Sequence, residues 1–147
     1  MLYVYVIVRT VLSNKGENIM RLEGKIGLVT AAGSGMGRAG AIRFAQEGAA
    51  VGVVDVDEGA VAAVVTEIEE NGGKAKGIVA DLTKDADSKR IVTETAKYFN
   101  GLDFVWNHVG YPGPASVEGV EMDDFDLTLD LNSVSYTHLT LPTRSEV

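Results

Sequence analysis

The stretch "VTAAGSGMGRAG", Val29 to Gly40, joins an apolar run to a helical pattern through a turn rich in glycine. Three glycines, Gly33, Gly35 and Gly37, fall within five residues. Glycine lets the backbone turn tightly and lets a ligand approach the main chain closely. The N–H groups and positive dipole at the start of the following helix favour an anion such as a pyrophosphate. The stretch therefore predicts a strand–turn–helix unit that binds a phosphate-bearing ligand; a plain turn that tolerates glycine is the weaker interpretation.

Apolar runs and helical patterns alternate along the chain on both sides of this turn. The predicted strands cover residues 25–30, 49–57, 75–83 and 102–107, and the predicted helices cover residues 37–48, 58–71, 85–98 and 122–131. Strands that alternate with helices of this length are typical of βαβ units, and hence of a parallel sheet with helices on both faces. We therefore predict an α/β fold, a Rossmann-type doubly wound parallel sheet, truncated after about the fourth strand and the helix that follows it.

The spacing of apolar residues predicts which face of each helix lies against the sheet. The predicted inward residues are Ala39, Ile42 and Ala45 in the first helix, Val61, Val64, Val65 and Ile68 in the second, and Ile91, Val92 and Thr95 in the third. The sequence contains no repeat, low-complexity tract or linker, which indicates one domain.

Composition and charge argue against several classes of protein. The net charge of −8 argues against binding to nucleic acid or to an anionic membrane surface, because both repel an acidic protein. The chain contains no cysteine, which rules out disulfides and thiolate ligands and fits a reducing cytoplasm. His108 and His138 lack zinc-ligand spacing, so no metal site is expected.

Asp55 ends the second predicted strand, eighteen residues after Gly37. A carboxylate at this place accepts hydrogen bonds from a ribose 2′-OH and repels a 2′-phosphate, so it favours NAD over NADP. The alternative is a solvated or helix-capping aspartate. Asp57 is the better candidate for that cap, since it directly precedes the next helix.

The order of these features resembles the classical short-chain dehydrogenases/reductases. Their cofactor turn, T-G-x-x-x-G-x-G, corresponds to Thr30 through Gly37, with Ala31 in place of the first glycine. If position 31 needs a positive φ, alanine costs about 1 kcal/mol there, unless Gly33 absorbs the turn. The pattern G-x-G-x-x-G also fits Gly35, Gly37 and Gly40, but it starts too far from the strand. We therefore place Gly40 inside the helix, close to the sheet.

Three later segments continue the resemblance, which covers about residues 21–132. Asp81-Leu82-Thr83 is similar to the family's aspartate motif, which contacts the adenine. "LDFVWNHVG" resembles L-D-x-x-x-N-N-A-G: Asn107 and Gly110 match, whereas His108 and Val109 depart from it, and we expect His108 to be a packing residue. "FDLTLDLN" resembles the helix that ends in the family's catalytic asparagine, which gives Asn132 that role.

The resemblance implies hydride transfer between a nicotinamide cofactor, preferably NAD, and a small-molecule carbonyl or alcohol substrate. The implied cofactor-binding residues are Gly33, Ser34, Gly35, Met36, Gly37, Asp55, Asp81, Leu82, Asn107 and Gly110, and the implied catalytic residue is Asn132. It also implies that the intact enzyme is a homo-oligomer. The composition, by contrast, is what indicates a cytoplasmic protein with no nucleic-acid or membrane partner.

The family also uses a serine and a Tyr-x-x-x-Lys motif, usually dozens of residues beyond the asparagine. Tyr136 does not supply that motif, because Thr140 stands where the lysine would be, and no lysine follows Lys97. We therefore expect the chain of 147 residues to be inactive as it stands.

Both ends of the chain are expected to lie outside the domain. We predict that residues 1–19 are a spurious upstream extension, because "KGE" before Met20 can be encoded by a ribosome-binding sequence. Residues 134–147 are a predicted non-native tail, because "VSYTHLTLPT" is similar to a translated sequencing adapter. Residues 20–133 are then the N-terminal part of an NAD(P)-binding Rossmann domain.

Two other functions stay open at this point. The glycines and Asp55 also suit the adenosyl group and ribose of S-adenosylmethionine, as in methyltransferases. Those enzymes usually carry an acidic residue just before their glycines, where this chain has Thr30-Ala31-Ala32. A non-catalytic dinucleotide-binding module differs from the dehydrogenase only if the intact gene lacks Tyr-x-x-x-Lys.

Overall fold

The computed structural model describes residues 20–113 and 118–134, and it confirms the predicted alternation of strands and helices. The elements are β1 (Ile26–Val29), α1 (Gly35–Gln46), β2 (Ala50–Asp55), α2 (Glu58–Glu70), β3 (Lys74–Val79), α3 (Asp85–Phe99), β4 (Phe104–Trp106), α4 (Met122–Leu129) and the π-helix η1 (Asp130–Val134). The predicted upstream extension, and the predicted tail except for its first residue, lie outside the described residues.

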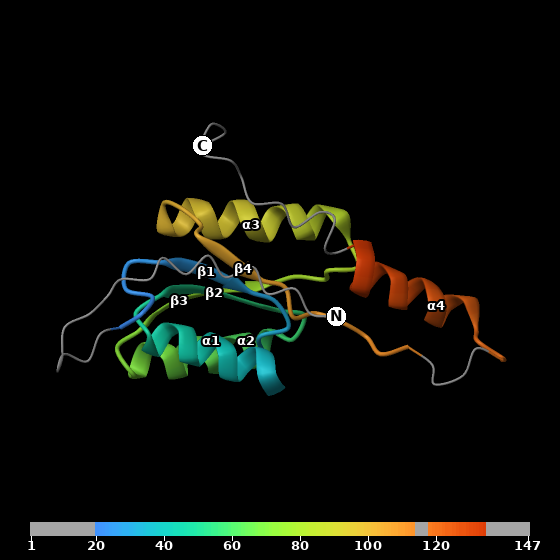
Figure 1. Ribbon diagram of the computed structural model, residues 1–147, viewed down its shortest axis with the longest axis horizontal. Coiled ribbons are helices and arrows are strands. Elements are labelled where there is room, and N and C mark those ends of the chain that lie inside the picture. Colours follow the sequence, from blue (N-terminus) through green and yellow to red (C-terminus); the bar gives the residue numbers. More distant parts are fainter. Residues whose placement is uncertain (1–19, 114–117, 135–147) are drawn as a thin grey trace.

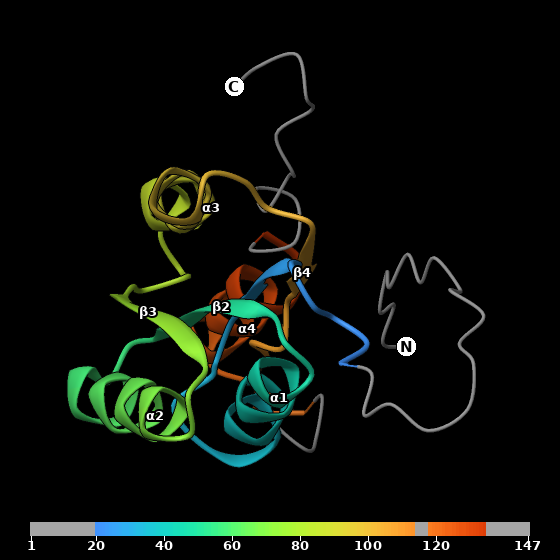
Figure 2. The ribbon, with the colours of Figure 1, turned by 90° about the vertical axis from the view of Figure 1, so that its left-hand side faces the viewer.

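The four strands form one parallel sheet in the order β3-β2-β1-β4. Helices α1 and α2 cover one face of this sheet, and α3 covers the other (Figure 2). The predicted doubly wound sheet is therefore confirmed. The direction of the strand order reverses beside β1, and open α/β sheets bind ligands outside the carboxyl ends of their strands at such a point.

Small residues let α1 pack closely against the sheet. Gly37, Ala41 and Ala45 are its buried residues, at a spacing of four. The prediction that Ala39 faces inward is wrong. Gly37 and Ala41 lie on the buried face of the helix, and Ala39, two residues from each, lies on the opposite side and is exposed. The predicted inward residues of α2 and α3 are buried, apart from the half-buried Val65.

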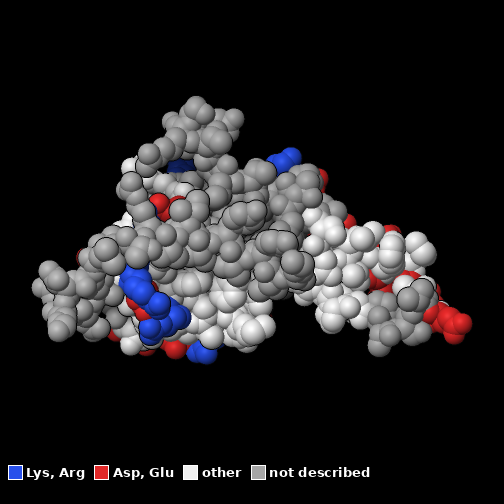
Figure 3. Space-filling model, viewed as in Figure 1, with Lys and Arg blue, Asp and Glu red and all other residues white. Residues whose placement is uncertain are grey.

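Asp57 caps α2, as predicted. Its Oδ1 accepts the N–H of Ala60 at 2.9 Å, which satisfies one of the donors that a helix start leaves unpaired. In contrast to the other helices, α4 projects beyond the sheet (Figure 1). The acidic residues of its first turn, Asp123 and Asp124, lie at the end farthest from the sheet, where Figure 3 shows acidic surface. Within the described ranges, no helix combines the length and apolar character that a membrane crossing requires.

Glu47 connects the end of α1 to the segment before β1. Its carboxylate accepts the main-chain N–H of Arg21 at 3.1 Å and the guanidinium of Arg21 at 3.0 and 3.2 Å, and it also pairs with Arg43. These contacts, the hydrogen bond from the Arg21 side chain first, lower the pKa of Glu47 from 4.5 to about 2. A depressed carboxylate pKa stabilises the fold above pH 4.5, and that contribution is lost as the pH falls towards 2.

We expect Glu47→Gln to destabilise the chain at pH 7 and to have a smaller effect at pH 3. The native protein loses a large part of the Glu47 contribution between those two values, because pH 3 lies below 4.5 and still above the folded pKa of about 2. Urea unfolding of both proteins at pH 7 and pH 3 measures this difference. Glu23→Gln, at an exposed carboxylate, is the control. An equal effect of Glu47→Gln at both pH values would contradict the assignment.

Candidate functional site

The glycine-rich turn presents the start of α1 at the carboxyl edge of the sheet. Gly35 begins the helix with φ +52°, and a Cβ added there would meet no heavy atom within 4 Å. Ser34, the residue before it, makes no side-chain hydrogen bond to the helix start, and the first turn of α1 contains no acidic residue. Met36 is 70% exposed. The turn therefore offers an uncapped helix start with open space in front of it, which suits a phosphate.

Ala31, rather than Gly33, takes the left-handed conformation in this turn. Its φ is +49°, whereas Gly33 does not have a positive φ, so the alternative in which Gly33 absorbs the turn is wrong. Gly33 is needed for space instead, because an added Cβ would lie 2.8 Å from Ala60 and 2.9 Å from Asp55. Gly37 has the same reason: its Cβ would lie 2.0 Å from the carbonyl oxygen of Ala31.

We expect Ala31→Gly to stabilise the chain by about 1 kcal/mol. Glycine removes the steric strain of the left-handed backbone at position 31, and this gain is partly offset because glycine gives the unfolded chain more conformational freedom. Urea unfolding measures the change. The control is Ala32→Gly, at a fully buried neighbour without positive φ, which we expect to destabilise the chain. Destabilisation by both substitutions would show that the strain at Ala31 is not significant.

Asp55 lies at the end of β2 and holds the glycine-rich turn. Its Oδ2 accepts the N–H of Gly33 at 2.9 Å, and its Oδ1 accepts the N–H groups of Val56 and Asp57 at 2.8 and 3.2 Å. Asp55 is half-buried, and both of its carboxylate oxygens accept main-chain N–H groups. The structure therefore brings together Gly33 and Asp55, two of the predicted site residues.

The hydroxyl of Thr30 connects the ends of β1 and β4. It donates to Oδ1 of Asn107 at 2.7 Å and accepts the N–H groups of His108 and Val109 at 2.8 and 3.1 Å. Thr30 is fully buried and Asn107 is 7% exposed, so these bonds are shielded from water. Thr30 was not among the predicted site residues, although its place directly before the glycine-rich turn was a signal.

His108 packs against Trp106, with ring centroids 5.0 Å apart. This contact confirms the expectation that His108 is a packing residue. Trp106 in turn packs against α1, where an added Cβ at Gly40 would lie 1.8 Å from the indole. The prediction that Gly40 lies inside the helix, close to the sheet, is confirmed.

Asn132 lies on η1 and clamps the loop that follows β4. Its Oδ1 accepts the N–H of Tyr111 at 3.1 Å, and its Nδ2 donates to the carbonyl oxygen of Tyr111 at 2.6 Å. Gly110 leaves room for this contact, because its Cβ would lie 2.9 Å from Oδ1 of Asn132. The predicted helix 122–131 is α-helical only to Leu129 and continues as a π-helix, a form that is frequent at functional sites. The side chain of Asn132 therefore holds the main chain at Tyr111 in the described structure.

Asp81 and Leu82 follow β3 and differ in their surroundings. The carboxylate of Asp81 accepts the hydroxyl of Thr83 at 2.7 Å and pairs with Nζ of Lys84 at 3.0 Å. The Thr83 hydroxyl first, and then Lys84, hold the pKa of Asp81 below its usual range, so the carboxylate stays charged at neutral pH. Leu82 is buried in the core cluster that includes Ile91 and Val92 of α3.

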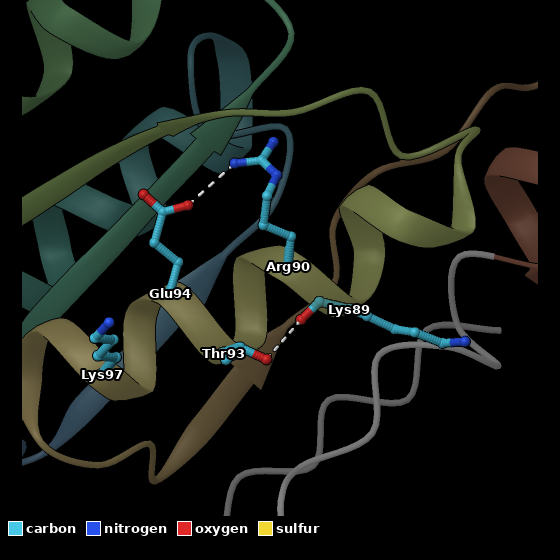
Figure 4. Close-up of a pocket in the computed structure, with 5 residues that line it drawn as sticks. All are labelled: Lys89, Arg90, Thr93, Glu94 and Lys97. Carbon is cyan, nitrogen blue, oxygen red and sulfur yellow. Dashed lines mark hydrogen bonds and ion pairs between the residues drawn. The ribbon is translucent and has the colours of Figure 1, made fainter.

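All predicted residues of the cofactor site thus follow strands at the carboxyl edge of one parallel sheet. The ends of β2 and β3 are connected directly, since the N–H of Ala80 donates to the carbonyl oxygen of Asp55 at 3.0 Å. A hollow on α3, lined by Lys89, Arg90, Thr93, Glu94 and Lys97 (Figure 4), shares none of these residues. No group of acidic residues and histidines that could hold a metal ion occurs in the described ranges.

Comparison with known proteins places the chain among dehydrogenases. The sequence profile described as short chain dehydrogenase matches residues 25–143. The chain is 37% identical over 113 residues to an uncharacterized oxidoreductase of Thermotoga maritima, and this match covers 77% of the chain and 44% of that protein.

Solved structures show the same similarity. A 7α-hydroxysteroid dehydrogenase in complex with NADH and 7-oxo glycochenodeoxycholic acid matches with a TM-score of 0.78 at 34% identity, over 82% of the chain and 47% of that protein. A short-chain dehydrogenase of Burkholderia cenocepacia in complex with NADP matches with a TM-score of 0.77 at 34% identity, over 80% of the chain and 49% of that protein. The chain spans about half the length of these relatives.

Proposed function

Because the chain belongs to the short-chain dehydrogenase family, we propose that it is the N-terminal part of a nicotinamide-dependent oxidoreductase. The reaction of the whole enzyme is hydride transfer between the nicotinamide and a small-molecule carbonyl or alcohol. One observation carries the proposal: the turn from Gly33 to Gly37 is fixed by Asp55 at the point where the strand order reverses. Dinucleotides bind at that point in open α/β sheets.

We propose NAD rather than NADP as the cofactor. The carboxylate of Asp55 lies at the end of β2, where it would accept hydrogen bonds from ribose hydroxyls and disfavour a 2′-phosphate. Solved relatives contain NADH in one case and NADP in another, so the family alone does not decide between them.

The described residues have distinct tasks in this proposal. The first turn of α1, which includes Met36, and the preceding Ser34 hold the pyrophosphate. Asp55 holds the adenosine ribose, and Asp81 with the Leu82 main chain receives the adenine. Asn107 and Gly110 shape the loop beyond β4, which Asn132 clamps through Tyr111. The nicotinamide, when bound, would give or accept the hydride. Proton transfer needs the family's Tyr-x-x-x-Lys, and none follows Asn132 here, so we propose that this chain binds without catalysing.

Fluorescence of Trp106 tests the binding proposal, because it is the sole tryptophan and packs against α1 and His108. We expect NADH to quench it and S-adenosylmethionine to leave it unchanged. N-acetyltryptophanamide in the same titrations corrects for absorption of light by NADH. Quenching by S-adenosylmethionine alone would instead support the methyltransferase, and a response to neither ligand would overturn the proposal for this chain.

An activity assay on the same chain tests the proposal that it binds the cofactor without catalysing the reaction. We expect no NADH oxidation with any carbonyl substrate even at saturating NADH. The dehydrogenase and a non-catalytic binding module are separated by the source DNA: a longer frame with Ser and Tyr-x-x-x-Lys supports the enzyme. The source DNA also tests the proposal that residues 134–147 are non-native. The family profile does not decide this question, because its match runs to residue 143 and so includes part of the predicted tail.

We further propose that the intact enzyme is a homo-oligomer of the cytoplasm. Met122, Phe125 and Leu129 are all exposed at helical spacing on α4, an apolar stripe that a second copy would cover. The absence of cysteine fits a reducing compartment. The net charge of −8 supports the proposal that neither nucleic acid nor a membrane is a partner.

A further inference from the structure

Two charged residues of α3 hold the loop that carries Asp81. Asp87, in the first turn of the helix, accepts the main-chain N–H of Asp81 on its Oδ2 at 2.8 Å. This bond runs back from the helix to the residue that precedes Leu82. The position of the Asp81 main chain is therefore set by a side chain outside the predicted cofactor site.

Arg90 completes the connection. Its Nη2 donates to the carbonyl oxygen of Val79 at 2.8 Å and to Oδ1 of Asp87 at 3.0 Å, and its Nε donates to the same Oδ1 at 3.1 Å. Nη1 of Arg90 also donates to Glu94 at 3.0 Å, and Figure 4 shows Arg90 and Glu94 on α3. Asp87 and Arg90 together thus bind the main chain at Asp81 and Val79, on both sides of Ala80.

Both residues are charged and partly shielded from water. The side chain of Asp87 is 25% exposed, and that of Arg90 is 43% exposed. The N–H of Asp81 first, and then Arg90, keep the pKa of Asp87 below its usual range. The hydrogen bonds of Asp87 and Arg90 to the main chain of Asp81 and Val79 are therefore maintained throughout the neutral pH range.

Asp87 and Arg90 contact the chain at the end of β3, apart from the apolar side chains that bury α3 against the sheet. Ile91, Val92 and Thr95 are buried on the inner face of α3, whereas the side chains of Asp87 and Arg90 bond outside α3 to main-chain atoms of Asp81 and of Val79, the last residue of β3. Substitution of Asp87 or Arg90 should consequently release the loop while the helix remains in place.

We infer that Asp87 and Arg90 are positioning residues for the adenine end of the dinucleotide: they fix the loop so that the Asp81 carboxylate meets the adenine amino group. The inference rests on the proposed function. A hydrogen bond requires its donor and acceptor to be held in a narrow geometry, so a loop that is fixed before binding matters even for a single hydrogen bond.

The test compares NADH with deamino-NADH, in which a carbonyl replaces the adenine amino group. We expect the native chain to bind NADH about tenfold more tightly than deamino-NADH, the factor that one hydrogen bond to a charged group typically contributes. In Asp87→Ala and Arg90→Met, we expect this ratio to fall to about two or less, because the Asp81 carboxylate is no longer held in place. Trp106 fluorescence measures both affinities, and circular dichroism checks that the variants are folded.

Two controls separate this inference from a general loss of structure. Glu94→Gln removes a partner of Arg90 and leaves its bonds to Val79 and Asp87, so the ratio should stay native. Lys97→Met makes the same change of charge and shape as Arg90→Met farther along α3, and the ratio should again stay native.

The inference would be overturned if the ratio of NADH to deamino-NADH affinity stays native in Asp87→Ala, or if it is already one in the unchanged chain. In either case, binding of NADH leaves the proposed function intact. Weaker binding of both nucleotides by the same factor would also overturn it, since that indicates a structural role. A native chain that binds neither nucleotide overturns the proposed function itself, and this inference with it.

Discussion

Replacement of Gly40 by alanine is expected to destabilise the chain by about 2 to 3 kcal/mol, the upper part of the range for overpacked cores. The new Cβ would lie 1.8 Å from Cζ3 and 2.7 Å from Cη2 of Trp106, so the indole must move. The indole has little freedom to do so, because Phe44 packs against it with ring centroids 5.5 Å apart. Alanine has the better helix propensity by about 0.5 to 1 kcal/mol, which offsets only a part of the clash.

Urea unfolding of three proteins tests this expectation. Gly59→Ala is the matched control, since Gly59 also lies in a helix but its Cβ would have only one near neighbour, Oδ1 of Asp57 at 3.3 Å. The double variant Gly40→Ala/Trp106→Leu should cost less than the sum of its single changes, by about 1 kcal/mol or more for residues in contact. Equal effects at Gly40 and Gly59 would show that the indole is not confined against α1.

The sequence predicted those features that depend on neighbours along the chain. Asp57 could be identified as a cap because it directly precedes a helical pattern, and the cap bond reaches only three residues. Asp55 could be placed beside the glycine-rich turn because consecutive parallel strands end at the same edge of a sheet. Gly40 could be placed near the sheet because it follows Gly37 within one turn of the helix.

Features that depend on distant partners were not predictable in this way. Ala31 has positive φ although alanine disfavours it, because the turn is fixed from outside by the bond between Gly33 and Asp55. Thr30 looked like the last residue of a strand, and its role depends on Asn107 and the residues after it, at least 77 positions away. The π-helix at Asn132 accompanies a side-chain clamp on Tyr111, 21 positions earlier, which helical periodicity does not reveal.

The ratio of NADPH to NADH affinity is expected to rise on Asp55→Asn, with NADH itself bound more weakly. Asparagine keeps one oxygen acceptor for the Gly33 turn but removes the charge that repels a 2′-phosphate and strengthens the bonds to ribose hydroxyls. Hydrogen bonds to a charged group contribute about 1.5 to 3 kcal/mol, which corresponds to a loss of NADH affinity of roughly tenfold to a hundredfold.

Asp57→Asn is the matched control for this change. It removes the same charge two positions further on, and asparagine caps a helix as well as aspartate does, so α2 should keep its start. If both variants raise the NADPH ratio equally, the general negative field around α2 selects the cofactor. If only Asp55→Asn raises it, the selection comes from the carboxylate that also holds Gly33. Turn geometry and cofactor choice then depend on one side chain, and Asp55→Ala should lower the affinity for both nucleotides because it releases the turn as well.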